Sequence, residues 1–123
     1  MEYSRDSSFN MGIAHLTRID ALLYDVTSFS GDEDYENWHR SLNALSREVF
    51  FLFNETDMTQ SAEHDNNCAN AINNFKIDKT YGNKTICYNQ LIAYELFIKQ
   101  QLAQRKMLMA FSKDLRVSIS DLG

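Results

Sequence analysis

The segment from Asp34 to Phe53, DYENWHRSLNALSREVFFLF, carries the most regular hydrophobic pattern in the chain. Its apolar residues recur at intervals of three or four, which places them along one side of an α-helix: Tyr35, Trp38, Leu42, Leu45, Val49 and Leu52. If fully buried, side chains of this size contribute roughly 1.5–3 kcal/mol each, most of which is offset by conformational entropy. The stripe therefore predicts a helix over residues 33–53 that packs against other helices of its own chain.

The composition favours helices for the rest of the chain as well. The 123 residues include no proline and only four glycines. Turns of all-β domains depend on both residue types, whereas long helices need neither. With 44% hydrophobic residues, the chain is expected to fold as one globular domain over residues 1–123.

Hydrophobic spacing predicts three further helices, over residues 10–27, 54–75 and 85–113. The last of these is apolar nearly all round in its first half, so it is expected to be the longest and most buried. Residues suited to helix ends mark the boundaries: Asn10, Thr56, Asp57 and Thr85 as N-caps, Gly31 in the left-handed conformation, and Gly82–Asn83 as a turn. The fold class expected is all-α, an antiparallel four-helix bundle with a long C-terminal helix.

The two ends of the chain have different patterns. Residues 1–8 are polar and predict a loose N-terminal arm. In residues 115–123, the apolar residues Leu115, Val117 and Ile119 alternate with polar ones, which predicts a short extended tail.

Charge is distributed unevenly along the chain. Residues 1–66 hold 13 acidic and 4 basic residues, a net of −9, whereas residues 67–123 hold 4 acidic and 8 basic residues, a net of +4. Either the two halves complement each other within one fold, or oppositely charged faces bring copies or partners together. The net charge of −5 makes general nucleic-acid binding unlikely for this chain.

The cellular environment of the protein is predicted from three features that the sequence lacks. The sequence contains no run of 18 apolar residues, so it predicts no membrane span. The N-terminal segment has no apolar region typical of a secretory signal. Two cysteines are too few for a disulfide scaffold, so a reducing, cytoplasmic environment is expected.

Zinc is the first chemistry to consider. His64 and Cys68 lie one helical turn apart, Asp65 is adjacent, and Cys87 follows after the predicted turn. Paired Cys-x-x-Cys spacing is missing, however, and buried free cysteines with a surface histidine explain these residues more simply. We therefore expect no metal or other cofactor.

Catalytic patterns are equally weak. No histidine has the upstream arginine found in some small helical RNases, and no phosphate loop or nucleophile motif is present. His39 is expected on a solvated helix shoulder, and His15 half-buried beside its stripe. The acids of GDEDYE suit a helix start rather than an oxygen-ligand site. The chain is predicted not to be an enzyme.

Glu95 lies among apolar residues of the predicted C-terminal helix. A buried carboxylate needs a partner, and the candidates are Lys99, Arg105, Arg18 and Arg47. A structural ion pair is the simpler interpretation, and a functional group with a raised pKa is the alternative.

The remaining hypothesis is a small helical interaction or assembly protein that completes its core with a second copy or within a larger complex. Such a role fits a viral or mobile-element structural or accessory protein. The expected interface combines the phenylalanine-rich end of residues 33–53 with the second half of the C-terminal helix: Phe50, Phe51, Phe53, Leu102, Met107, Met109 and Phe111.

Two other functions remain open. A basic loop and C-terminal stretch would serve a small nucleic-acid-associated regulator through Lys76, Lys79, Lys84, Arg105 and Lys106. The acidic first half would instead suit an inhibitor that mimics nucleic acid.

Overall fold

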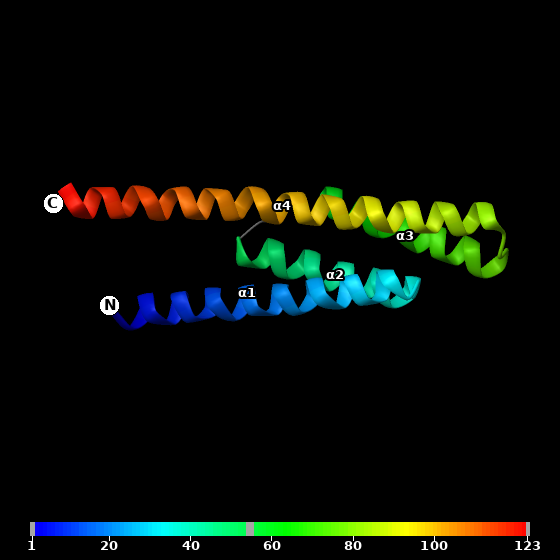
Figure 1. Cartoon of the computed structure of the whole chain (residues 1–123), viewed down its shortest axis with the longest axis horizontal. Helices are drawn as coiled ribbons and strands as arrows, with labels where there is room; N and C mark the ends of the chain where they lie inside the picture. The colour runs from blue at the N-terminus through cyan, green and yellow to red at the C-terminus, as the bar shows by residue number, and fades with distance from the viewer. Residues whose placement is uncertain (1, 54–55, 123) are drawn as a thin grey trace.

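Four α-helices and no strand make up the described part of the chain in a computed structural model, which describes the backbone of residues 2–53 and 56–122 and the side chains of residues 14–53 and 56–105. The helices are α1 (Glu2–Gly31), α2 (Tyr35–Leu52), α3 (Thr59–Ile77) and α4 (Tyr81–Leu122). Their packing is that of a helical bundle, which confirms the all-α fold class (Figure 1).

Helix α2 is the centre of this arrangement. It contacts each of the other three helices, whereas the close backbone contacts of α1, within the described residues, are with α2 alone. Figure 1 shows α2 between α1 on one side and α4 on the other. The prediction that the C-terminal helix is the most buried is therefore wrong, because α4 lies along one edge of the molecule and, over the residues described, contacts α2 and α3 but not α1.

The hydrophobic stripe of α2 forms the middle of the core, as predicted. Trp38, Leu42, Leu45 and Val49 are fully buried, and Leu52 is partly buried against the same cluster. The other helices contribute the remaining buried apolar residues: Ile19 and Val26 from α1, Cys68, Ala71 and Ile72 from α3, and Cys87, Leu91, Tyr94, Ile98 and Leu102 from α4.

The turn between α1 and α2 differs from the prediction in one detail. Gly31 does not have a positive φ; the left-handed residue is Glu33, with φ 55°. Asp34 then caps α2, because its Oδ1 accepts a hydrogen bond from the backbone N–H of Asn37 at 3.4 Å. Glycine is the residue type that most readily adopts the left-handed conformation, but the structure has that conformation two residues later, at Glu33.

The link between α3 and α4 is shorter than predicted. Helix α4 begins at Tyr81, so Gly82–Asn83 lies in its first turn rather than in a loop. Thr80 is the cap, since its Oγ1 accepts the Asn83 N–H at 3.1 Å. The Thr85 hydroxyl instead donates back to the Tyr81 carbonyl at 3.0 Å, so the prediction of a Thr85 cap is wrong.

At the start of α3, the predicted caps are also one or two residues early. The helix begins at Thr59 after Met58, which makes no side-chain cap. Asp57 accepts hydrogen bonds from the backbone N–H and hydroxyl of Thr59, at 3.1 and 2.7 Å, and so orders the turn that precedes the helix.

Both predicted irregular ends are helical in backbone. Helix α1 extends back to Glu2, so Asn10 lies inside it and residues 2–8 do not form a loose arm. Helix α4 extends to Leu122, which replaces the predicted extended tail. Three alternating apolar residues could not decide the period, since Leu115, Ile119 and Leu122 also have helical spacing and no proline interrupts the segment.

The uneven charge distribution is partly balanced within the fold. Lys76 pairs with Glu36, and Lys84 Nζ lies 2.8 Å from Glu33 Oε2, so basic residues of the second half meet acidic residues of the first. None of the helices, over the residues described, combines the length and hydrophobicity that crossing a bilayer requires.

Candidate functional site

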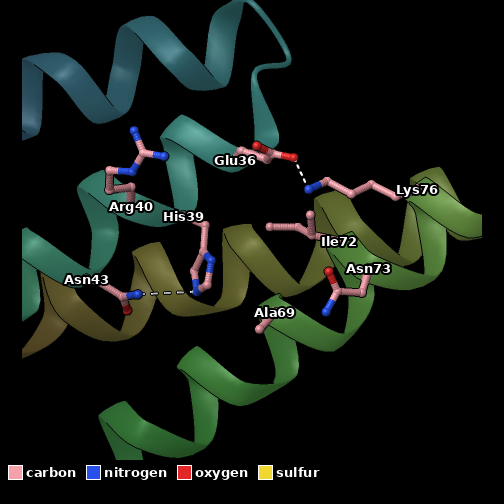
Figure 2. Close-up of a pocket in the computed structure, with 8 residues that line it drawn as sticks. All are labelled: Glu36, His39, Arg40, Asn43, Ala69, Ile72, Asn73 and Lys76. Atoms are coloured by element: carbon pink, nitrogen blue, oxygen red, sulfur yellow. Dashed lines mark hydrogen bonds and ion pairs between the residues drawn. The ribbon is translucent and has the colours of Figure 1, made fainter.

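A polar groove of about 320 Å³ lies between α2 and α3. Figure 2 shows its walls, with four residues from each helix: Glu36, His39, Arg40, Asn43, Ala69, Ile72, Asn73 and Lys76. Each set follows the spacing i, i+3, i+4, i+7, which places four side chains on one face of a helix. The groove is therefore formed by two facing helix surfaces.

Lysine and glutamate close one end of this groove. Lys76 from α3 reaches Glu36 at the start of α2, and both side chains are about half exposed (Figure 2). An exposed pair of this kind contributes little to stability, but it joins the two helices across the groove.

His39 lies farther along the groove, between Glu36 and Asn43, and two polar side chains are close to it (Figure 2). Its Nε2 lies 2.7 Å from Asp65 Oδ1 on α3 and 3.4 Å from Asn43 Nδ2. Because an ionised carboxylate can only accept, His39 Nε2 carries the hydrogen and donates to Asp65 Oδ1. The Asn43 amide therefore donates to the same oxygen, at 3.0 Å, rather than to the histidine. The His39 side chain is only 16% exposed, so the prediction of a solvated helix shoulder is wrong.

The hydrogen bonds continue from Asn43 into the core. Tyr94 on α4 donates its hydroxyl to Asn43 Oδ1 at 2.8 Å and lies 3.2 Å from Ser61 Oγ. Ser61 in turn bonds Ser46, and both serines are buried. The network thus runs across α2, α3 and α4, and it fixes how the three helices are rotated and aligned, because each buried polar group needs its partner.

Burial changes the acid–base chemistry of this network. It raises the pKa of Tyr94, and hydrogen bonds from Ser61 and Ser46 only partly oppose that shift. A tyrosine hydroxyl is protonated at neutral pH in any case, so the raised pKa extends to higher pH the range over which Tyr94 serves as a donor. His64 covers the same tyrosine, with parallel rings whose centroids are 5.6 Å apart.

A second hollow, of about 220 Å³, opens beside the same network. It is lined by Asn43, Ser46, Arg47, Met58, Ser61, Ala62, Asp65 and Tyr94. A third, of about 310 Å³, lies where α4 begins, and its walls are Glu33, Tyr35, Tyr81, Lys84, Thr85 and Tyr88. The Glu33–Lys84 ion pair lies among the residues that line this third hollow.

The zinc candidates serve other roles. Cys68 and Cys87 are buried free thiols, and burial raises their pKa to about 12 and about 11. Cys68 Sγ donates to the Gln90 carbonyl at 3.3 Å, and His64 packs on Tyr94 and Phe97. Over the residues whose side chains are described, no three His, Cys, Asp or Glu residues are grouped so as to hold a metal ion.

Glu95 is held as a structural carboxylate. Its side chain is 13% exposed, Lys99 Nζ lies 3.2 Å from Oε2, and Trp38 Nε1 donates to Oε1 at 3.1 Å. Of the candidate partners, Lys99 makes the ion pair. Of the three arginine candidates, Arg18 bonds to Glu48 and Arg105 to Gln101, and Arg47 is exposed on α2.

His15 is half-buried, as predicted, and joins α1 to α2. Its Nδ1 lies 2.8 Å from Glu48 Oε2, and Arg18 NH1 lies 3.2 Å from the other oxygen of the same carboxylate. The contact between His15 and Glu48 was not predicted, since a single acid on a helix carries no signal of a partner 33 residues away.

The predicted interface residues differ in how exposed they are in the structure. Phe50 and Leu102 are each 5% exposed within the chain's own core, contrary to the expectation that they form an exposed interface. Phe53 is partly buried against that core, whereas Phe51 is 63% exposed and contacts His15. The side chains of Met107, Met109 and Phe111 lie outside the described residues.

The predicted nucleic-acid residues do not form one free cationic surface. Lys76 and Lys84 are engaged with Glu36 and Glu33, and Arg105 lies over the Phe50 ring at 5.4 Å from its centroid. Lys79 is exposed in the link before α4. The side chain of Lys106 lies outside the described residues.

Exposed apolar side chains concentrate elsewhere. Seven large hydrophobic residues of the described part are exposed, and five of them come from one stretch at the end of α3 and the first half of α4: Ile77, Tyr81, Ile86, Tyr88 and Leu96. The sequence predicted that residues 86–98 of this stretch are apolar nearly all round, but it did not show which side of the helix remains uncovered.

Comparison of the chain with protein-family models, with curated proteins and with solved structures finds no match.

Proposed function

We propose that this protein is a non-enzymatic helical interaction or assembly protein, which associates with a second copy or within a larger protein complex. The observation that carries the proposal is the concentration of exposed apolar side chains on the first half of α4 and the turn before it. Single exposed apolar residues are ordinary on a protein surface, whereas five on one stretch of the chain favour a protein interface there.

The polar groups of the α2–α3 groove support a structural role for that region. Asp65, Asn43 and Tyr94 are bonded to one another, and His39 is bonded to Asp65. A network whose members satisfy each other specifies the packing of helices, which is what an assembly protein needs in a rigid scaffold.

The finer architecture belongs to the same proposal. Short links between α1 and α2 and between α3 and α4 favour an antiparallel order of neighbouring helices. A long C-terminal helix that projects beyond its neighbours would present surface to a partner, in keeping with an assembly role.

Size-exclusion chromatography with light scattering on the full chain tests the proposal. We expect a mass above one chain at high micromolar concentration that falls towards one chain on dilution. A one-chain mass throughout, together with a one-chain band after cross-linking in the expressing cells, would overturn it.

A salt-dependent binding assay separates the nucleic-acid alternative. Affinity for DNA or RNA that falls steeply as salt is added would favour the regulator hypothesis and count against an assembly role. We expect weak or no binding, because Lys76 and Lys84 are already paired with acidic side chains.

A further inference from the structure

The outer face of α4, opposite the core, is open to solvent. Its members are all exposed, with Ile86 and Leu96 at 53% each: Ile86, Asn89, Ala93, Leu96, Gln100 and Ala103. On the opposite side of the same helix, Leu91 and Ile98 are buried in the core. Figure 1 shows α4 along the edge of the molecule, with α1 and α2 on one side of it and α3 passing behind it.

The spacing of these residues is that of a helix–helix seam. They follow one another at intervals of three, four, three, four and three, which lines them up along one face of the helix, and four of the six are apolar. Alanine at two of the positions allows close approach of a second helix. We call this set of six residues the α4 seam.

The α4 seam carries no charge, although the whole chain has a net charge of −5. Between residues 85 and 104 the only charged side chains are Glu95 and Lys99, which pair with each other at 3.2 Å. A neutral surface is where two copies of an acidic chain approach with the least repulsion.

The order of residues along the seam is self-complementary when two copies run in opposite directions. With a two-fold axis between Ala93 and Leu96, each apolar layer sets a large side chain against a small one. Ile86 of one copy meets Ala103 of the other, and Ala93 meets Leu96. The remaining layer sets Asn89 against Gln100, and both amides donate and accept hydrogen bonds.

We infer that the α4 seam is the surface on which two copies of this chain pair, antiparallel, around a two-fold axis between Ala93 and Leu96. This inference rests on the proposed assembly function and names its partner as a second copy. A two-fold interface is built from the same patch on both subunits, and this patch meets that requirement. A parallel pairing would instead place alanine on alanine at residue 93.

Charge substitutions in the full chain test the inference. A93E and L96K each place a charge in the centre of the seam at an exposed position, so helix content by circular dichroism should be unchanged. Sedimentation equilibrium should show the dimer dissociation constant raised by about tenfold or more in each. The double variant A93E/L96K places opposite charges face to face, so the dissociation constant should return to within a few-fold of the original.

A control variant and a distance measurement complete the test. Y24E changes a residue of α1 that is 76% exposed, so it should leave the dissociation constant unchanged. A spin label at A103C reports direction, because antiparallel copies separate the two labels by roughly 25 Å along the helix axis, whereas parallel copies bring them together.

The outcomes are distinct. A dimer that survives both single substitutions overturns the α4 seam as the interface and leaves the assembly function standing on another surface. Loss of the dimer without recovery in the double variant, or labels close together, overturns the antiparallel arrangement. A chain that stays monomeric at every concentration overturns both the inference and the proposed self-association, and binding of a different protein at the seam would identify another occupant.

Discussion

Trp38 on α2 donates its indole N–H to Oε1 of Glu95 on α4 at 3.1 Å, although the two residues are 57 positions apart. The indole is fully buried, and the other carboxylate oxygen meets Lys99 at the edge of the core. This bond joins the central helix to the edge helix, and it gives a nearly buried carboxylate the partner that its desolvation requires.

Replacing Trp38 tests this relationship. Trp38→Phe removes the donor and part of the packed volume, so the free energy of unfolding should fall by about 2–3 kcal/mol. Urea unfolding followed by circular dichroism measures the change, since Trp38 is the only tryptophan. Glu95→Gln keeps an acceptor for the indole and should lower stability by less than about 1 kcal/mol. An equal loss of stability in both variants would mean that the ion pair between Glu95 and Lys99 contributes more than the hydrogen bond from Trp38.

The hydroxyl of Tyr94 provides a second test. Tyr94→Phe leaves Asn43 Oδ1 without its donor in a part-buried site, so stability should fall by about 1–3 kcal/mol in urea unfolding. The matched control is Tyr88→Phe, because that ring is 43% exposed, and it should change stability by less than about 0.5 kcal/mol. Similar values for the two would show that the network contributes nothing beyond ring packing.

Neighbouring phenylalanines should differ sharply. Phe50 is 5% exposed beneath Arg105, whereas Phe51 is 63% exposed. Phe50→Ala should therefore destabilise the fold by about 3 kcal/mol or more, and Phe51→Ala by about 1 kcal/mol at most. Thermal unfolding at equal protein concentration compares them, and the reverse order would contradict the burial of Phe50.

Stability should fall in alkaline solution because of the two buried thiols. Their pKa is raised to about 12 for Cys68 and about 11 for Cys87, from an ordinary value of 9.0. A raised pKa means that the folded chain holds its protons more tightly, so the stabilisation is complete below pH 9 and is lost as pH rises towards 11–12.

At pH 10 the loss should be about 1 kcal/mol for each thiol, relative to pH 8. Urea unfolding at the two pH values measures it. The variant with Cys68→Ala and Cys87→Ala is less stable at both values, yet its loss between them should be clearly smaller. An unchanged pH dependence would assign the effect to other groups.

The turn before α2 contains a position where glycine should be better than the native residue. Glu33 has φ 55°, a conformation that costs an L-residue about 1 kcal/mol or more. Glu33→Gly and Glu33→Ala both lose the ion pair with Lys84, so their difference isolates the backbone term. We expect the glycine variant to be more stable than the alanine variant by about 1 kcal/mol in urea unfolding.

Helix content and the core of α2 were predictable because they are local properties. The spacing from Tyr35 to Leu52 repeats with the period of a helix, and side chains on one face of a helix are buried or exposed together. Helix ends were less predictable, since Gly31 and Glu33 compete for the turn and Thr80 and Thr85 compete for the cap. Such choices depend on small energy differences between neighbouring residues.

Most contacts of the candidate site could not be predicted from the sequence. His39 and Asp65 are 26 positions apart, and their contact depends on how α2 and α3 are rotated about their axes. Asn43, Ser46 and Ser61 carry no pattern that distinguishes them from surface polar residues. Their contacts depend on Tyr94 of α4, whose hydroxyl reaches Asn43 and Ser61 in the folded chain.

By itself, the sequence determined that this chain forms helices with α2 as a strongly apolar element, because helix formation and amphipathicity depend on residues within a few positions of one another. Only the tertiary structure decided that α2, rather than α4, lies at the centre and that one neutral face of α4 is left uncovered. Which faces meet depends on the packing of all four helices at once, and that is decided by contacts between residues far apart in the chain.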